Sequence, residues 1–208
     1  MNFAVGLAQD GKRVGLLDAD LFGPSIPRMM KLTGEPFVKD NKFVPLANHG
    51  VKCMSMGFLV READAVVWRG LMVMKAVQQL LWQVDWGELD VLVIDLPPGT
   101  GDVPLTIAQQ VLVDGAIIVT TPQQVALSDV KRGIEMFKKL DIPIYGLVQN
   151  MSYFQCSKCS EKHYLFGGLE GCDSLGLKTL GSFPITPAIA SEGDAGIPRG
   201  IKLDIQLE

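Results

Sequence analysis

The chain has 208 residues, of which 48% are hydrophobic and 20% are charged, and its formal net charge is −4. Such a length supports one domain with a sizeable core, and such a composition is ordinary for a globular protein. The acidic balance excludes the basic footprint of a nucleic-acid-binding protein, and no apolar run approaches the roughly 18 residues of a membrane span. Neither nucleic acid binding nor membrane insertion is therefore expected.

The first residues and the cysteines bear on the compartment. Residues 1–4 show neither the basic start of a signal peptide nor an Arg- and Ser-rich transit pattern. Four cysteines are too few and too unevenly spaced for the disulfide framework of a small secreted domain. A reducing compartment is favoured, either where the protein is made or where a leader outside this sequence would send it.

Short apolar segments alternate with helical patterns along the chain. The expected strands are residues 14–17, 51–54, 91–94, 116–119 and 144–148. One helical face is formed by Val73, Val77, Leu80, Leu81 and Val84, and another by Leu127, Val130, Ile134, Phe137 and Leu140. This alternation predicts βαβ units, a mostly parallel sheet and a single domain over residues 1–208. Residues 151–181, rich in Cys, Ser, Gly and charge, are expected to form an excursion that carries a site.

A near match to a phosphate-binding loop lies close to the start of the chain. Residues 6–13 approach the pattern Gly-x₄-Gly-Lys-[Ser/Thr]. Arg13 replaces the hydroxyl residue that binds Mg²⁺, and a helical stretch precedes the segment while a strand follows it, the reverse of the required context. We therefore expect a helix-to-strand turn at Gly11.

Two carboxylates follow the first expected strand. Residues 18–25 read Asp-Ala-Asp-Leu-Phe-Gly-Pro-Ser. Carboxylates at the end of a parallel strand, beside a Gly-Pro turn, can position a water molecule or Mg²⁺, whereas an Asx-type turn needs no such chemistry. A third carboxylate after another strand, Asp95, favours the functional interpretation.

The most informative pattern is the run Val-Leu-Val-Ile-Asp-Leu-Pro-Pro-Gly-Thr-Gly-Asp at residues 91–102. Its four apolar residues suit a strand buried on both faces, and Asp95 stands where that strand emerges. In P-loop NTPases this is the position of the Walker B carboxylate that helps hold Mg²⁺. The Pro- and Gly-rich turn is interpreted as a loop that senses the γ-phosphate, with a stiff connection as the alternative. Asp102 is expected to cap the helix that Pro104 opens.

Three further features are interpreted from their place in the sequence. Asn150, after the last expected strand, can cap the next element or hydrogen-bond a purine edge through its amide. Cys53 lies within an apolar strand and is expected in the core. The region around Trp68, Trp82 and Trp86 is rich in Met and Leu, which is typical of a core but also of a dimer interface.

Cys156 and Cys159 form a Cys-x₂-Cys pair, whose two thiolates can bind one soft metal centre from a single turn. A cluster or a structural zinc usually takes four protein ligands, so the pair needs completion. His163 and Cys172 can complete a mononuclear zinc site, or two chains can each contribute a pair and bridge a cluster across a symmetric dimer. A redox-active pair fits poorly, because thioredoxin-like sites open a helix after a strand near the chain start; inert thiols are the remaining alternative.

Five segments occur together and in order along the chain. They are Asp-Ala-Asp-Leu-Phe-Gly-Pro-Ser at 18–25, Val-Trp-Arg-Gly-Leu-Met at 67–72, Asp-Leu-Pro-Pro-Gly-Thr-Gly-Asp at 95–102, Val-Gln-Asn-Met-Ser at 148–152 and the Cys-x₂-Cys pair at 156–159. Together they resemble the Mrp-type family of P-loop ATPases that carry iron–sulfur clusters, most closely its mitochondrial branch that assists assembly of respiratory complex I. The resemblance extends to about Pro198. It implies an α/β, P-loop NTPase-like fold, doubly wound around a mostly parallel sheet.

The resemblance implies roles for residues of these motifs. Cys156 and Cys159 of two subunits would hold a bridging [4Fe–4S] cluster. Asp20 resembles the switch carboxylate near the attacking water, and Asp95 resembles the Mg²⁺-linked Walker B residue. The residues expected at bound ATP are Asp18, Pro98, Gly99 and Asn150, with Asn150 as the adenine-reading amide.

The implied function is that of an iron–sulfur cluster carrier. The chain is expected to act as a homodimer or related heterodimer, to use ATP and Mg²⁺, and to deliver its cluster to apo iron–sulfur proteins such as complex I subunits. The implied location is the mitochondrial matrix, with the cytoplasm as the alternative. The alternative functions are a non-catalytic zinc-binding or interaction module and an inactive truncated paralogue.

The chain also departs from the family pattern. Family members begin with a strand, a Lys-Gly-Gly-x-Gly-Lys-Ser-type phosphate loop and a helix that contains a stretch similar to residues 2–8, whereas this sequence starts within that helix. The residues after Pro198 do not resemble the family's final helix. The fold is therefore expected to be incomplete at its N-terminus and its C-terminus, and the resemblance leaves open whether this chain hydrolyses ATP.

Overall fold

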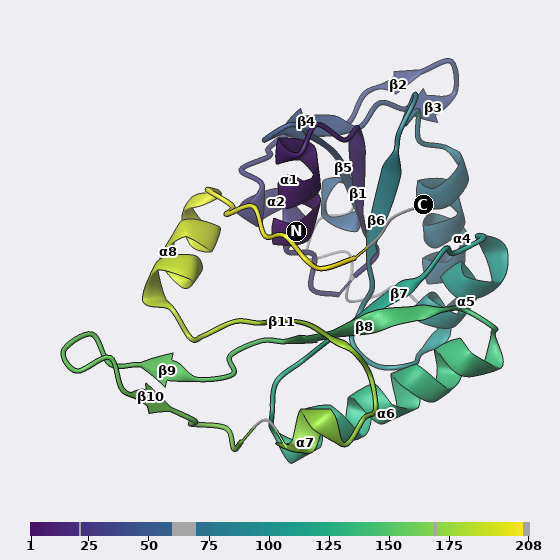
Figure 1. The fold of residues 1–208 in the computed structure, drawn as a ribbon. Helices are drawn as coiled ribbons and strands as arrows, with labels where there is room; N and C mark the ends of the chain where they lie inside the picture. Colours follow the sequence, from purple (N-terminus) through teal and green to yellow (C-terminus); the bar gives the residue numbers. More distant parts are fainter. Residues whose placement is uncertain (21, 60–69, 169, 206–208) are drawn as a thin grey trace. The chain divides into compact units, whose positions relative to one another are not determined.

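The computed structural model describes residues 1–20, 22–59, 70–168 and 170–205 (Figure 1). The chain divides into two compact units, Met1–Pro98 with Ala188–Lys202 and Gly99–Pro187 with Leu203–Glu208. The single domain expected from the sequence stays a prediction. Trp68 and the first residues of the 67–72 motif lie outside the described residues. Among the described residues, no helix is long and apolar enough to cross a membrane.

The first unit is built on a sheet whose described strands run in the order β4-β5-β1-β6. These strands are β1 (Val14–Asp18), β4 (Leu46–Asn48), β5 (Val51–Ser55) and β6 (Val91–Asp95). β5, β1 and β6 are parallel and β4 is antiparallel to β5, which confirms the predicted strands and their mostly parallel arrangement. β1 is buried along its whole length, with a parallel strand on each side and α1 packed against it.

The first unit also contains helices and a hairpin. They are α1 (Asn2–Gln9), α2 (Ile26–Met29), the 3₁₀ helix η1 (Met56–Phe58), α4 (Gly70–Trp82), α8 (Pro187–Ala195), and the hairpin of β2 (Val38–Lys39) and β3 (Lys42–Phe43). α1 packs against β1 and β5, and α2 packs against β5 and η1. Cys53 lies fully buried in the resulting core, as predicted. α4 buries Val73, Val77 and Leu80, but Trp82 is 61% exposed, so Trp82 does not take the core alternative, and the dimer interface stays a prediction.

The segment 6–13 forms the predicted helix-to-strand turn. α1 ends at Gln9, Gly11 has a φ of 84°, and β1 begins at Val14. Gly6 has a separate role, because a Cβ built on it would lie 2.2 Å from the carbonyl oxygen of Ile201. The backbone of Ile201 thus crosses α1 so closely that position 6 has no room for a side chain.

Gly6→Ala is therefore expected to destabilise the fold by about 1–3 kcal/mol, since the added methyl group must displace the Ile201 backbone. Gly133→Ala is the matched control, because Gly133 lies within α6 (Gln124–Lys139) and a Cβ there meets no atom within 4 Å. The control should gain about 0.5–1 kcal/mol from helix propensity. Urea unfolding measures both variants, and equal stabilities would contradict the close contact at Gly6.

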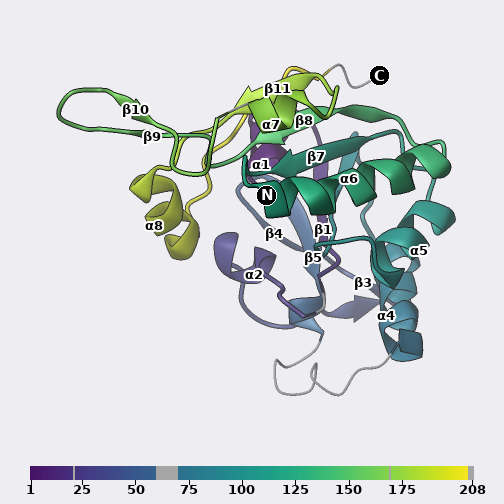
Figure 2. The ribbon, with the colours of Figure 1, turned by 90° about the horizontal axis from the view of Figure 1, so that it is seen from below.

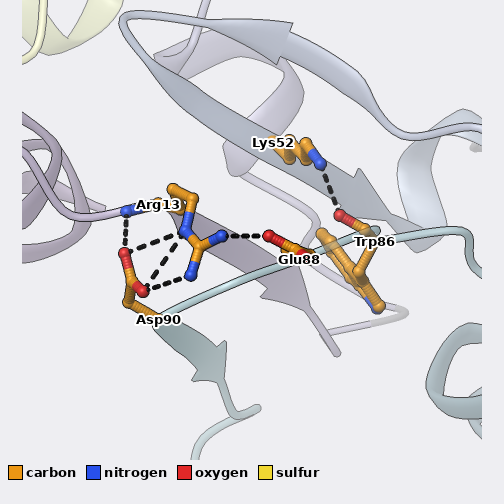
Figure 3. Close-up of polar contacts among 5 residues, drawn as sticks. All are labelled: Arg13, Lys52, Trp86, Glu88 and Asp90. Atoms are coloured by element: carbon orange, nitrogen blue, oxygen red, sulfur yellow. Dashed lines mark hydrogen bonds and ion pairs between the residues drawn. The ribbon is translucent and has the colours of Figure 1, made fainter.

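The segment between α4 and β6 is held by polar contacts at the start of β1 and on β5 (Figure 3). The guanidinium of Arg13 donates to both carboxylate oxygens of Asp90 and, at 2.5 Å, to Glu88. These hydrogen bonds and the charge of Arg13 lower the pKa of Asp90 to about 2. Lys52 Nζ donates to the carbonyl of Trp86 at 2.5 Å. The contacts fix the segment that leads into β6.

The second unit holds a parallel sheet with the described strand order β11-β8-β7. Its elements are α5 (Asp102–Gln110), β7 (Ala116–Thr120), α6, β8 (Ile144–Gln149), β9 (Phe154–Gln155), β10 (Lys162–His163), α7 (Glu170–Asp173) and β11 (Thr179–Ser182). α6 packs against β7 and α7, and its predicted face with Leu127, Ile134 and Phe137 is buried. The expected excursion contains the antiparallel β9–β10 hairpin, which extends away from this sheet in Figures 1 and 2.

Two expectations for the 91–102 run are wrong. Residues 91–94 of β6 are only half-buried and Asp95 is exposed, because β6 lies at the edge of its sheet with β1 as its one described neighbour. Asp102 is the first helical residue of α5, and Gly101 is the cap. The Asp102 carboxylate therefore lies in the first turn of α5, where a negative charge interacts favourably with the helix dipole.

Candidate functional site

Three strands of the first unit end at one edge of its sheet and bring polar residues together. The parallel register pairs Asp18 of β1 with Ser55 of β5 on one side and with Asp95 of β6 on the other. Asp18 and Asp95 therefore stand on neighbouring strand ends, as the two strand-terminal motifs predict. Ser55 is a third polar residue at this edge that sequence reasoning misses, because a serine at the end of an apolar strand has no distinctive spacing.

Asp18 is a buried carboxylate with hydrogen-bond donors on both oxygens. Oδ2 accepts the Ser55 hydroxyl at 2.9 Å and the backbone N–H of Ile26 at 3.2 Å, and Oδ1 accepts the N–H of Asp20 at 3.2 Å. Burial raises the pKa of Asp18, the three hydrogen bonds oppose the rise, and the charge of Asp95 adds to it. The donors stabilise the charged form that burial disfavours.

Asp20 forms the Asx-type turn that the sequence offers as an alternative. Its Oδ1 accepts hydrogen bonds from the N–H groups of Phe22 and Gly23, both at 3.1 Å. A Cβ on Gly23 would lie 3.3 Å from Oδ2, so the glycine keeps space beside that oxygen. Oδ2 has no hydrogen-bond donor in the described part of the chain, which leaves it available to a water molecule or a cation.

Asp95 ends β6 with an exposed side chain, and its backbone carbonyl accepts the N–H of Ala19 at 2.9 Å. The loop at residues 97–101 joins the two units, whose division falls between Pro98 and Gly99. Both of these residues are exposed, and Gly99 has a φ of 87°, a conformation that favours glycine. Sensing of a γ-phosphate by this loop stays a prediction.

Asn150 belongs to the second unit and directly follows β8. Its N–H donates to the carbonyl of Thr120 at the end of β7 at 2.7 Å, and its side-chain Oδ1 accepts the N–H of Met151 at 3.0 Å. Asn150 is exposed, and this turn leaves its Nδ2, a hydrogen-bond donor, available at the carboxyl ends of the strands. The adenine contact of Asn150 stays a prediction.

Cys156 and Cys159 lie at the tip of the β9–β10 hairpin. The N–H of Cys156 donates to the carbonyl of Glu161, and the N–H of Ser160 donates to the carbonyl of Cys156, both at 2.9 Å. Both thiols are free, with Cys156 half-buried and Cys159 exposed. Hydrogen bonds from the N–H groups of Cys159 and Lys158 lower the pKa of Cys156, which favours the thiolate, the form that binds metal.

His163 and Cys172 do not complete a metal site with this pair. His163 is an exposed residue of β10 whose ring faces Phe154, with 6.5 Å between the ring centroids. Cys172 is buried on α7, and burial and the charge of Asp173 raise its pKa. Within the described ranges, no three His, Cys, Asp or Glu residues are grouped as ligands of one metal ion. The single-chain zinc site is therefore not formed in this structure.

These environments predict an order of thiol reactivity. Iodoacetamide should modify Cys156 and Cys159 of the native chain at least about tenfold faster than Cys53 and Cys172. Burial raises the pKa of Cys53 to about 12, and Cys172 is also enclosed. Mass spectrometry after timed alkylation measures each site, with denatured protein, in which all the thiols should react alike, as the control. Rapid labelling of Cys172 in the folded chain would contradict its burial.

A family model covers almost the entire chain. The model described as ParA, NUBPL iron-transfer P-loop NTPase, matches residues 1–205. The chain belongs to this family. Membership in the NUBPL family confirms the resemblance drawn from the motifs, and with it the α/β, P-loop NTPase-like fold with a mostly parallel sheet.

Relatives of the chain have names that agree with this family. The iron-sulfur cluster transfer protein NUBPL of Dictyostelium discoideum is 54% identical over 205 residues, which are 95% of this chain and 63% of the relative. The iron-sulfur protein required for NADH dehydrogenase, mitochondrial, of Arabidopsis thaliana is 49% identical over 204 residues, which are 95% of this chain and 65% of the relative. The chain thus spans a little less than two thirds of the length of these relatives.

A solved structure shares the fold. The nucleotide-binding protein of Archaeoglobus fulgidus, in complex with ADP, is 38% identical to this chain. It superposes with a TM-score of 0.80 over 93% of this chain and 78% of its own. The fold of this NUBPL-family chain is therefore also the fold of a nucleotide-binding protein.

Proposed function

We propose that this chain is an iron–sulfur cluster carrier that binds a [4Fe–4S] cluster between the Cys156–Cys159 pairs of two subunits and delivers it to apo iron–sulfur proteins. The hairpin tip carries the proposal: it presents two neighbouring free thiols, one of them with a lowered pKa, and no third ligand in the described part of the chain. Two subunits related by a twofold axis would supply four equivalent thiolates. The names of the relatives support cluster transfer.

Carboxylates of the first unit fit the metal side of an ATP·Mg²⁺ site. We assign exposed Asp95 to Mg²⁺ and Asp20, through its open Oδ2, to the attacking water. Both offer the oxygen ligands that Mg²⁺ prefers, and Mg²⁺ would supply neutralisation of the phosphate charge. The phosphate side is not represented, because the 208 residues contain no Gly-x₄-Gly-Lys-[Ser/Thr] loop between a strand and a helix.

The remaining nucleotide contacts come from three exposed residues. Pro98 and Gly99 are assigned to the γ-phosphate, since they follow the strand that ends in Asp95. Asn150 is assigned to the adenine, whose ring nitrogens accept hydrogen bonds from an amide N–H₂. We further propose that cluster release depends on the nucleotide, because the fold is that of a P-loop NTPase.

The proposed recipients are apo subunits of respiratory complex I, and the proposed location is the mitochondrial matrix. Support comes from the relative whose name specifies both NADH dehydrogenase and the mitochondrion. A cytoplasmic location with other apo iron–sulfur recipients is the alternative.

Anaerobic reconstitution with iron and sulfide tests the carrier. The chain should take up about four irons per dimer and absorb visible light as a [4Fe–4S] cluster does. Cys156→Ser and Cys159→Ser should each lose the cluster, because each removes one thiolate from both subunits. Cys172→Ser, which replaces a buried thiol on α7, is the matched control and should retain it.

Two outcomes would contradict the carrier. Uptake of one zinc per monomer, abolished by His163→Ala, would favour the single-chain zinc module. A cluster that survives Cys156→Ser and Cys159→Ser would show that the β9–β10 hairpin does not bind it. Size-exclusion chromatography of the reconstituted protein adds a second readout, since the cluster should elute with a dimer.

A further inference from the structure

We propose that Ser55 is a positioning residue which, through Asp18, fixes the loop that carries Asp20. The inference rests on the role proposed for Asp20 at the nucleotide. Ser55 is 0% exposed at the end of β5, opposite Asp18 in the parallel register. Its hydroxyl donates to Asp18 Oδ2 at 2.9 Å and accepts the N–H of Gly57 at 3.0 Å. The hydroxyl therefore uses its one donor and one of its two acceptor lone pairs.

Asp18 transmits the position of Ser55 to the loop. Its Oδ1 accepts the N–H of Asp20 and its Oδ2 accepts the N–H of Ile26. The carboxylate is therefore hydrogen-bonded to both ends of the segment that runs from β1 to α2. These three donors on its two oxygens tie Asp18 to the loop and to β5, and a contact of Asp18 with bound ATP stays a prediction. The direction in which the chain leaves β1, and hence the direction of Asp20 Oδ2, follows from the position of Asp18.

Ser55 is anchored on its own side by η1. It is the cap of this helix, with an extended backbone at φ −143° and ψ 148°. A Cβ on Gly57 would lie 3.1 Å from Pro24 and also 3.1 Å from Pro27, so the first turn of η1 packs directly against the far end of the Asp20 loop. A hydroxyl at position 55 thus joins η1, β1 and the loop, and an apolar side chain would leave the Gly57 N–H and Asp18 Oδ2 short of a partner.

Backbone amide hydrogen exchange of the full chain, without nucleotide or cluster, tests this role. In Ser55→Ala, the amides of Asp20, Ile26 and Gly57 should exchange at least about tenfold faster, because each is held by Ser55 or by the carboxylate it orients. The amide of Leu16, within β1, should be unchanged. The NMR shift of the Asp18 carboxyl carbon at fixed pH should also move. Ser55→Thr, which keeps the hydroxyl and suits an extended backbone, should restore both readouts.

Ser152→Ala is the matched control. Ser152 is also 0% exposed, and its hydroxyl donates to the carbonyl of Phe183 at 2.9 Å in the second unit. Its loss should leave the Asp20 amide unchanged. If Ser55→Ala does not fold, Ser55→Cys, which keeps the shape but hydrogen-bonds weakly, carries the same expectation.

Unchanged exchange at Asp20 in the Ser55 variants, or equal acceleration by Ser152→Ala, would overturn the assignment. Neither result depends on iron uptake, so the test of Ser55 and the reconstitution test of the carrier fail independently.

Discussion

Titration of the 208-residue chain with Mg·ATP is expected to show no micromolar binding. The residues assigned to the nucleotide offer carboxylates, a short loop and one exposed amide. Carboxylates attract Mg²⁺ but repel phosphate oxygens, so they provide little affinity by themselves. P-loop NTPases bind the phosphates with backbone N–H groups and a lysine of a glycine-rich loop. In this chain the nearest match, residues 6–13, is a turn between α1 and β1, with the opposite order of elements.

The expected difference is large. A micromolar dissociation constant corresponds to about 8 kcal/mol of binding free energy and a millimolar one to about 4 kcal/mol. We expect the chain to bind Mg·ATP with a constant above about 1 mM, at least ~10³-fold weaker than a micromolar site. The metal contact proposed for Asp95 would account for the residual affinity.

Isothermal titration calorimetry measures the constant, and an extended chain provides the comparison. A strand followed by Lys-Gly-Gly-x-Gly-Lys-Ser, joined before Met1, should bring binding into the micromolar range. The same extension with its lysines replaced by alanine is the control and should restore little. Micromolar binding by the 208-residue chain alone would show that its phosphates are held by groups other than those of a P-loop.

Much of the fold could be predicted because burial dictates the strand pattern. Residues 14–17 are without polar side chains and residues 51–54 are apolar except for Lys52, and the structure places both segments in neighbouring parallel strands. The carboxyl ends of such strands meet at one edge, so the motifs that follow β1 and β6 bring Asp18 and Asp95 together without any further information.

The rest depended on tertiary neighbours that a single sequence does not display. The 91–94 run reads as a strand covered on both faces, yet β6 has one described neighbour and is half-buried. The Cys-x₂-Cys spacing leaves a zinc site and a bridged cluster equally open, and what favours the second is that the described residues bring no third ligand to the pair. Ser55 shows its role only through its hydrogen bonds to Asp18 and Gly57.

Self-association of the isolated chain is expected to rise with concentration. β6 and β7 each have a strand on one side and, in the described part of the chain, none on the other. Residues 91–94 are apolar and only half-buried, and Val119 of β7 is 60% exposed. The unpaired N–H and C=O groups of such an edge can hydrogen-bond to an extended segment of another chain, and the exposed apolar side chains favour this pairing. Heating should therefore give aggregation in place of a sharp, reversible transition.

Val119→Lys separates the strand edge from general surface hydrophobicity. A lysine on an edge strand opposes the addition of another strand, so the aggregated fraction, measured by light scattering, should fall about threefold or more. Leu112→Lys makes the same change in charge at a residue that is 93% exposed but lies outside every described strand, and it should leave aggregation nearly unchanged. Equal protection by both substitutions would assign the association to exposed apolar surface. A monodisperse wild-type chain that melts reversibly would mean that β6 and β7 are already covered, and the chain would then be stable without a further strand.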